Sequence, residues 1–179
     1  VPACSLIMEL QTIISRKVNP SETAVISVTE LTSDGTRNAL PGISVISGDV
    51  RSFNKKISMQ IQLEIQKIAN AIGLAHDLTV DFKYSKEFIP LINDPELTKK
   101  SLEVAMGVFG DDKTKIAKEP MTGSEDFARF LSNVPGSYAF IGNGLESAPL
   151  HTPNYDYNDN ILKPGAEYLI AVARSRLPD

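Results

Sequence analysis

Hydrophobic and polar positions in the first part of the chain predict one helix followed by two strands. Residues 6–17 carry apolar side chains at the three-and-four spacing of a single helix face and end with Arg16 and Lys17, where a helix C-terminus favours cations. Residues 23–31 and 43–53 are rich in β-branched side chains, which predicts a strand in each range. The turn-forming residues between these ranges predict a loop that joins the strands.

The clearest pattern in the sequence is an isoleucine stripe that predicts a second helix. Isoleucine recurs at intervals of three or four positions, at Ile57, Ile61, Ile65, Ile68 and Ile72. Asn54 is placed to cap this helix, and Gly73 is placed to end it. Apolar and polar side chains then alternate over residues 78–84, which predicts a third strand with one face in water.

The order of these elements indicates a two-layer sandwich of a sheet and helices. Helix, strand, strand, helix and strand become βαββαβ if one further strand precedes Val1. The chain also has no initiator methionine and no signal-peptide pattern, and it enters a helical pattern at once. We therefore expect that the sequence begins inside a domain and that the sandwich lacks its first strand.

The second half predicts the closing portion of a larger α/β domain. The expected elements, in chain order, are helices at about 95–109 and 123–136, a short strand at 137–142 and a helix at 164–177. Ser124 is the expected cap of the middle helix. Prolines and an Asn-Asp-Pro helix start near residue 90 favour a domain boundary there, with one domain at 1–88 and the other at 89–179.

The composition narrows the class of protein. The net charge is −4, which argues against a nucleic-acid-binding protein. No apolar run approaches the roughly 20 residues needed to cross a bilayer, so we expect no membrane-spanning segment. The single cysteine, Cys4, cannot form an internal disulfide, which suits a reducing cytoplasm.

His151 is the strongest candidate for chemistry because Pro149 and Pro153 hold it on a stiff, extended loop. Such a histidine can bind a metal through a neutral ring nitrogen or act as a general base. From the spacing alone, a loop histidine that is only hydrogen-bonded to backbone is the more common case.

Further candidates are expected at the same sheet edge as His151, where open α/β sheets bind ligands. Glu125 and Asp126 open a predicted helix, whose free N–H groups favour an anion. Gly142 ends the predicted strand, and a glycine there lets backbone approach a ligand closely. The alternative for the two carboxylates is that they only complement the helix N-terminus.

Longer motifs in both halves of the chain resemble one protein family. The run MTGSEDFARFLSNVPGSYAFIGNG, followed by PLHTPNYDYNDNILKPGAEYL, is similar to the C-terminal signature of the M20 metallopeptidase and amidohydrolase family. In the first half, GTRNALPG and GDVRSF resemble the lid or dimerisation domain of one branch of that family. This branch contains hippurate hydrolases, N-acyl-amino-acid amidohydrolases and N-acetyldiaminopimelate deacetylases. The resemblance covers nearly the whole chain in the correct order.

The resemblance implies an amidohydrolase that cleaves N-acyl amino acids with two divalent metal ions, zinc first, with manganese, cobalt or nickel as alternatives. His151 matches the last metal-binding histidine of the family, and Glu125, Asp126 and Gly142 lie in motifs beside the metal site or position the substrate. Asn38 and Arg51 match lid positions that reach a substrate carboxylate. Without the family, a surface charge at a strand end is the simpler interpretation of Arg51.

The same resemblance implies that this chain is only part of an enzyme. The earlier metal ligands and the general-base glutamate would lie before Val1, so we expect the chain alone to be inactive and not to retain metal. Lid domains of the family pair edge to edge, which predicts a homodimer. The alternative is a non-catalytic module for small-molecule binding or dimerisation, although such a module has no need of His151 in its proline-bounded loop.

Overall fold

The computed structural model describes residues 1–117 and 119–177. The chain forms two compact units: unit 1 contains residues 1–90 and 122–124, and unit 2 contains residues 91–121 and 125–179. The predicted boundary at 88/89 thus lies close to the observed division at 90/91, but the short segment 122–124 belongs to unit 1. The end of the predicted second domain, residues 178 and 179, lies outside the described residues. Among the described residues, no helix combines the length and apolar character that crossing a membrane requires.

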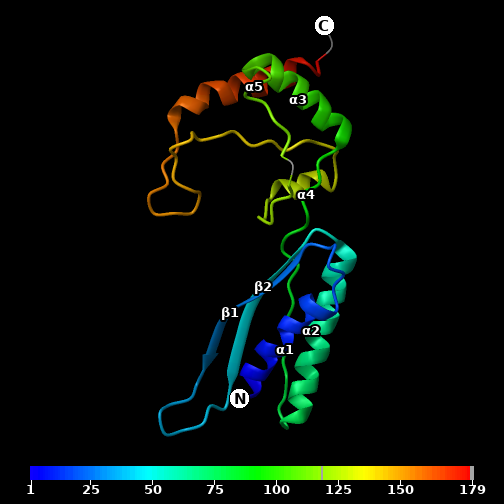
Figure 1. Cartoon of the computed structure of the whole chain (residues 1–179), viewed down its shortest axis with the longest axis vertical. Helices are drawn as coiled ribbons and strands as arrows, with labels where there is room; N and C mark the ends of the chain where they lie inside the picture. Colours follow the sequence, from blue (N-terminus) through cyan, green and yellow to red (C-terminus); the bar gives the residue numbers. More distant parts are fainter. Residues whose placement is uncertain (118, 178–179) are drawn as a thin grey trace. The chain divides into compact units, whose positions relative to one another are not determined.

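In unit 1, helices pack against a β-hairpin (Figure 1). In chain order the elements are α1 (Pro2–Arg16), β1 (Ala24–Ser33), β2 (Ser44–Ser52) and α2 (Lys55–Ala75). The strands are antiparallel, from the pair Ala24–Ser52 to the pair Ser33–Ser44, with a bulge between Val28 and Glu30. The predicted order of helix, strand, strand and helix is confirmed, and so is the mixed α/β class.

The core of unit 1 confirms the apolar stripes that were read from the sequence. Leu10 and Ile13 of α1 and Ile61 of α2 are buried, and both Ile13 and Ile61 have an exposed fraction of 0%. Partly buried side chains from both helices and both strands pack around them, among them Ile26, Val50, Ile57, Ile65 and Ile68. Burial of one such side chain is worth about 1.5–3 kcal/mol, so this cluster is the main stabilising feature of the unit.

Asn54 caps α2 as predicted, because its side chain accepts a hydrogen bond from the Lys56 N–H at 2.9 Å. Gly73, however, does not end the helix, which continues to Ala75. A Cβ atom at position 73 would lie 2.6 Å from Val80 Cγ2 and 3.0 Å from the Leu78 carbonyl oxygen. The glycine is therefore needed for the close approach of the segment that returns after the helix.

The predicted third strand is not formed in the described residues. Residues 78–84 have no sheet hydrogen bonds, and the described sheet contains β1 and β2 only. The expected alternation of burial holds only at its end, where Phe82 and Tyr84 are half-buried with their rings 6.2 Å apart, whereas Leu78 and Val80 are exposed. A strand also needs a neighbour that offers its backbone groups.

Unit 2 contains α3 (Pro95–Phe109), α4 (Phe127–Leu131) and α5 (Leu162–Arg174), with a short 3₁₀ turn at Asp159–Ile161 before α5 (Figure 1). The Asp94 carboxylate caps α3 by accepting from the Leu97 N–H at 2.8 Å, and Gly110 ends it with φ +89°. Helices α3 and α5 pack together, with the rings of Phe109 and Tyr168 5.9 Å apart. The predicted helices at 95–109 and 164–177 are thus present, the second one beginning and ending slightly earlier.

Two predictions for unit 2 were wrong in detail. The middle helix was expected over 123–136 with Ser124 as its cap, whereas α4 covers only Phe127–Leu131 and follows Asp126. Ser124 is not its cap, because the residue that directly precedes the helix is Asp126. The strand expected at 137–142 is also absent among the described residues. Instead the Asn93 side chain bonds the backbone of Tyr138, accepting from its N–H at 2.8 Å and donating to its carbonyl at 3.0 Å.

Candidate functional site

His151 lies exposed at the tip of a turn in unit 2, with its backbone in the left-handed region at φ +64°. Residues other than glycine rarely adopt this conformation, because the Cβ atom crowds the backbone. The turn is closed by the Thr152 hydroxyl, which donates to the Pro149 carbonyl at 2.8 Å, and by the Tyr155 N–H, which donates to the Thr152 carbonyl at 3.1 Å. The imidazole is therefore presented to solvent, but by a turn and not by the extended loop that the flanking prolines predicted.

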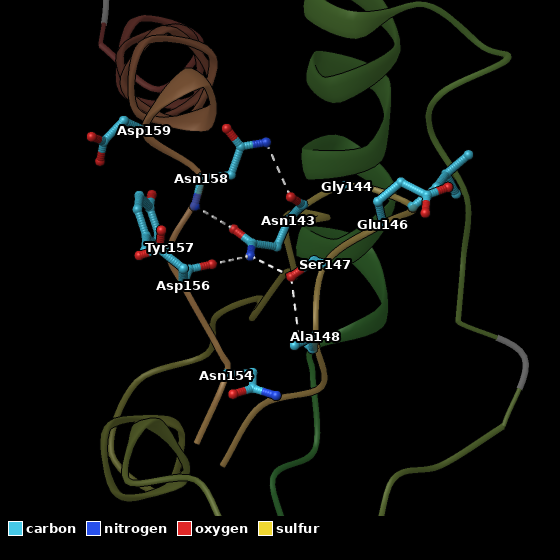
Figure 2. Close-up of a pocket in the computed structure, with 11 residues that line it drawn as sticks. Asn143, Gly144, Glu146, Ser147, Ala148, Asn154, Asp156, Tyr157, Asn158 and Asp159 are labelled. Atoms are coloured by element: carbon cyan, nitrogen blue, oxygen red, sulfur yellow. Dashed lines mark hydrogen bonds between the residues drawn. The ribbon is translucent and has the colours of Figure 1, made fainter. Parts of the chain in front are cut away.

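A pocket of about 560 Å³ lies at the base of the loop that carries His151. Figure 2 shows that residues 143–148 line one side of it, and Asn154 and residues 156–159 line the other. Glu146, Asp156 and Asp159 give the lining a negative charge. Even so, no three of the described His, Cys, Asp and Glu side chains gather closely enough to hold a metal ion. His151 therefore fits a metal as a single donor, and the described residues do not complete a metal centre.

Glu125 is engaged in structural hydrogen bonds within unit 2. One carboxylate oxygen accepts from the Phe127 N–H at 3.3 Å, and the other accepts from the Tyr138 hydroxyl at 2.8 Å. This hydrogen bond raises the pKa of the Tyr138 phenol, and burial and the negative charge of Glu125 raise it further. The alternative given for Glu125, a carboxylate that serves the helix N-terminus, is thus what its contacts support.

Asp126, by contrast, is exposed, and its side chain makes no capping hydrogen bond with α4. Gly142 is exposed too, and a Cβ atom added there would meet no described atom within 4 Å. The described structure therefore gives no steric reason for glycine at position 142, and the backbone there is open to an approaching group.

Arg51 lies near the end of β2 in unit 1 and is held from two sides. Its Nε donates to the Asp49 carboxylate at 2.6 Å, and Nη1 donates to the Thr122 carbonyl at 2.8 Å. Asp49 and Arg51 are two positions apart on one strand, so their side chains leave the same face. A guanidinium has five N–H donors, and those that remain are free to bind a carboxylate.

The structure does not bring Asn38 and Arg51 together within one chain. Asn38 lies in the loop between β1 and β2, where its side chain accepts from the Thr36 hydroxyl at 3.3 Å. Arg51 lies at the other end of β2, and the strand from Ser44 to Arg51 is about 23 Å long at about 3.3 Å per residue. This length exceeds that of a small acylated amino acid.

The structure also identifies residues that the sequence did not single out. Asn143 and Asn158 join the two sides of the His151 loop, and Asn93 and Tyr138 fix the segment beside Glu125. The Asn-Gly pair at 143–144 was a visible turn signal in the sequence. Its partner at 158 was not, because the contact joins residues 15 positions apart.

Comparison with known proteins finds one matching family and several similar proteins. The profile of peptidase family M20/M25/M40 matches residues 8–175. The N-acetyl-L-cysteine deacetylase of Bacillus subtilis is 32% identical over the whole chain, and the hippurate hydrolase of Campylobacter jejuni is 30% identical over 96% of it. A crystal structure of a dinuclear metal-binding M20 peptidase from B. subtilis superposes with a TM-score of 0.77 over 96% of the chain, at 22% identity.

The chain spans less than half of each of these proteins. The matches cover 42% of the deacetylase, 44% of the hippurate hydrolase and 44% of the dinuclear metal-binding peptidase. The 22% identity of the last match supports the fold of the described residues. The two named relatives act on acylated amino acids, as their names state.

Proposed function

The chain belongs to peptidase family M20/M25/M40, and we propose that the protein that contains it hydrolyses the amide bond of N-acyl amino acids. The observation that carries the proposal is the match of residues 8–175 to the family together with a solvent-presented His151. The substrate class follows from relatives that are named as a deacetylase of N-acetyl-L-cysteine and as a hippurate hydrolase.

The proposed cofactor is a pair of divalent metal ions, with zinc as the first choice and manganese, cobalt or nickel as alternatives, because imidazole and carboxylate ligands accept several such ions. When bound, the metals would supply an activated water for attack on the amide carbonyl. His151 would provide one metal ligand of this chain. The remaining ligands and the general-base glutamate would come from residues before Val1, so this chain alone is inactive under the proposal.

Arg51 would recognise the carboxylate of the substrate. Asp49 and the Thr122 carbonyl hold its guanidinium in place and leave donors for a carboxylate. The proposal assigns Asn38 to substrate binding as well, but its position at the opposite end of β2 means that it would not contact the same small molecule as Arg51 of its own chain. Asp126, which is exposed, is better placed than Glu125 to position a substrate.

We further propose that the protein is a cytoplasmic homodimer that pairs through unit 1. A strand edge with unpaired backbone groups is a site for pairing with another chain. Both strands of the hairpin also carry exposed apolar side chains, Val25 in β1 at 39% and Val45 in β2 at 51%. The cytoplasmic location rests on the single cysteine, Cys4, which suits a reducing compartment.

The proposal is tested in a longer protein in which the N-terminal part of the B. subtilis N-acetyl-L-cysteine deacetylase precedes Val1. We expect this protein to cleave one or more members of a panel of N-acyl amino acids when zinc, manganese or cobalt is added. Loss of a residue that orients a metal ligand from behind typically lowers metal affinity or activity about 10–100-fold. His151→Ala removes a proposed ligand itself, so it should lower both by more than that.

His76→Ala is the matched control, because His76 is exposed at the end of α2 and is not assigned to the site. It should leave metal content and activity unchanged. Full activity of His151→Ala would show that the ligand assignment is wrong. Absence of hydrolysis across the panel with every metal would favour the non-catalytic binding or dimerisation module instead.

A further inference from the structure

We propose that Asn143 and Asn158 are positioning residues that clamp the His151 loop, residues 143–158, in the conformation that presents His151. The assignment of the clamp to a metal ligand rests on the proposed function. The clamp itself follows from the contacts at the base of the loop, which Figure 2 shows.

The Asn143 side chain forms hydrogen bonds with the backbone on the opposite side of the loop, where a neighbouring strand would bond in a sheet. Its Oδ1 accepts from the Asn158 N–H at 2.8 Å, and its Nδ2 donates to the Asp156 carbonyl at 2.8 Å. The same Nδ2 donates to the Ser147 hydroxyl oxygen at 2.6 Å. An amide group has one acceptor oxygen and two N–H donors, so these contacts engage the oxygen and both donors. The side chain therefore binds the backbone on both sides of Tyr157, as a peptide group of a strand would.

Asn158 completes the clamp from the other side. Its Nδ2 donates to the Asn143 carbonyl at 3.1 Å, while its Oδ1 accepts from the Asn160 N–H at 3.1 Å. The second of these bonds caps the 3₁₀ turn that leads into α5. Within the described residues, every hydrogen bond that joins 143–148 to 154–159 involves Asn143. The geometry of the loop base thus depends on this one residue and on its reciprocal partner.

The need for a clamp arises from the backbone of His151. A non-glycine residue in the left-handed region persists only where surrounding contacts determine its conformation. At the tip, the contacts of Thr152 and Tyr155 close a local turn but do not anchor it to the rest of unit 2. The anchor is the pair at the base, which links the loop through Asn158 to the start of α5.

A positioning role has a chemical consequence for a metal ligand. A coordinating nitrogen must point in a fixed direction, and residues that orient a ligand from behind typically contribute about 10–100-fold to metal affinity. Asn143 and Asn158 would act in this way through the backbone of the loop. Neither of them needs to touch the metal or the substrate.

The clamp is tested on the full 179-residue chain by ¹⁵N relaxation at the amides of residues 150–152. In the unsubstituted chain we expect order parameters near the rigid value of about 0.85, and in Asn143→Ala values below about 0.6. Asn143→Asp should behave like the alanine variant at neutral pH, because a carboxylate cannot donate to the Asp156 carbonyl. Asn158→Ala should loosen the loop less, since it leaves the side-chain bonds of Asn143 across the loop in place.

Asn154→Ala is the matched control, because Asn154 lines the same pocket and its side chain makes no hydrogen bond among the described residues. It should leave the order parameters at 150–152 unchanged. The resonances of α3 and α5 report whether a variant remains folded. Unchanged order at residues 150–152 in a folded Asn143→Ala chain overturns the clamp.

Metal affinity of the longer protein separates the clamp from the proposed function. If Asn143→Ala disorders the loop while His151→Ala retains metal, the clamp stands and the metal role of His151 is wrong. If His151→Ala loses metal while Asn143→Ala keeps both the order of the loop and the metal affinity, the proposed function stands and the clamp is wrong. A 10–100-fold loss of affinity in Asn143→Ala, together with a disordered loop, supports both.

Discussion

His151, the proposed metal ligand, has an unfavourable backbone conformation. The left-handed region costs a residue with a Cβ atom roughly 1–2 kcal/mol, and His151 adopts it at φ +64°. A glycine would adopt the same turn more easily but would carry no imidazole. The strain at this position is consistent with the proposed role of His151 but does not establish it, since Asp77 also has a positive φ, of +54°.

Tyr138 and Glu125 give a prediction at alkaline pH. The hydrogen bond to Glu125 raises the pKa of the Tyr138 phenol above its ordinary value of 10.0, so the folded protein favours the protonated phenol. The resulting stabilisation is complete below pH 10 and is lost as the pH rises through the higher pKa of the folded state. In urea unfolding, the chain should therefore lose more stability above pH 10 than Tyr138→Phe does, because the variant has no phenol to ionise.

Tyr155→Phe serves as the control for this comparison, because its phenol makes no hydrogen bond with a carboxylate among the described residues. Tyr155→Phe should lose as much stability above pH 10 as the unsubstituted chain does. If Tyr138→Phe loses as much stability above pH 10 as the unsubstituted chain, the role assigned to the hydrogen bond with Glu125 is wrong.

At the scale of elements, two helical glycines are predicted to respond oppositely to alanine. Gly73 in α2 faces Val80 and Leu78 at distances of 2.6 and 3.0 Å from an added Cβ, whereas Gly107 in α3 has no described atom within 4 Å. Gly107→Ala should raise the free energy of unfolding by about 0.5–1 kcal/mol, because alanine has the better helix propensity. Gly73→Ala should lower it, because the returning segment must move away from α2.

Unfolding in urea, followed by circular dichroism, measures both effects. A double variant, Gly73→Ala with Val80→Ala, should recover part of the loss, because it shortens the side chain that the new methyl group meets. If Gly73→Ala stabilises the chain as Gly107→Ala does, the close approach between α2 and residues 78–80 is not formed in solution.

At the scale of the whole molecule, the described parts of the two units differ in their cores. Unit 1 has a buried cluster around Ile13 and Ile61, whereas Ala128 is the only buried hydrophobic side chain among the described residues of unit 2. In unit 2, large apolar side chains remain open, such as Phe130 and Phe140, which are 64% and 66% exposed. Exposed apolar side chains that are contiguous are typical of surfaces that contact another molecule or another part of the protein.

Hydrogen exchange of the chain should reflect this difference. Protection of an amide follows the free energy of local opening, which grows with buried apolar contacts. We therefore expect slower exchange in α1 and α2 than in α3 and α5, measured by mass spectrometry or NMR. Equal protection of all these helices would show that unit 2 is stabilised by something other than its described core.

The longer protein supplies the matching comparison. Under the proposed function, we expect the N-terminal part of the longer protein to cover apolar side chains of unit 2 such as Leu169 and Ile170 of α5, which are 67% and 50% exposed. Protection of α3 and α5 should then rise toward that of α1 and α2. Unchanged exchange in α3 and α5 would contradict this covering.

The elements that follow from a local pattern of residues were predictable from the sequence alone. The isoleucine stripe from Ile57 to Ile72, the cap at Asn54 and the breaks around β1 and β2 depend on periods of a few residues, which a single chain displays directly. The proline-bounded loop around His151 and its family motif belong to the same class. Helix, strand, strand and helix were therefore predictable, while the ligand role of His151 stays a prediction.

Features that depend on contacts between distant segments of the chain became visible only in the tertiary structure. Residues 78–84 and 137–142 have the alternation or the apolar character of strands, but pairing requires a neighbour that no local pattern can supply. The close approach at Gly73 involves Val80, the hydrogen bond of Glu125 involves Tyr138, and that of Asn143 involves Asn158. Each of these contacts depends on where the chain returns in space, which the spacing of residues along the sequence does not specify.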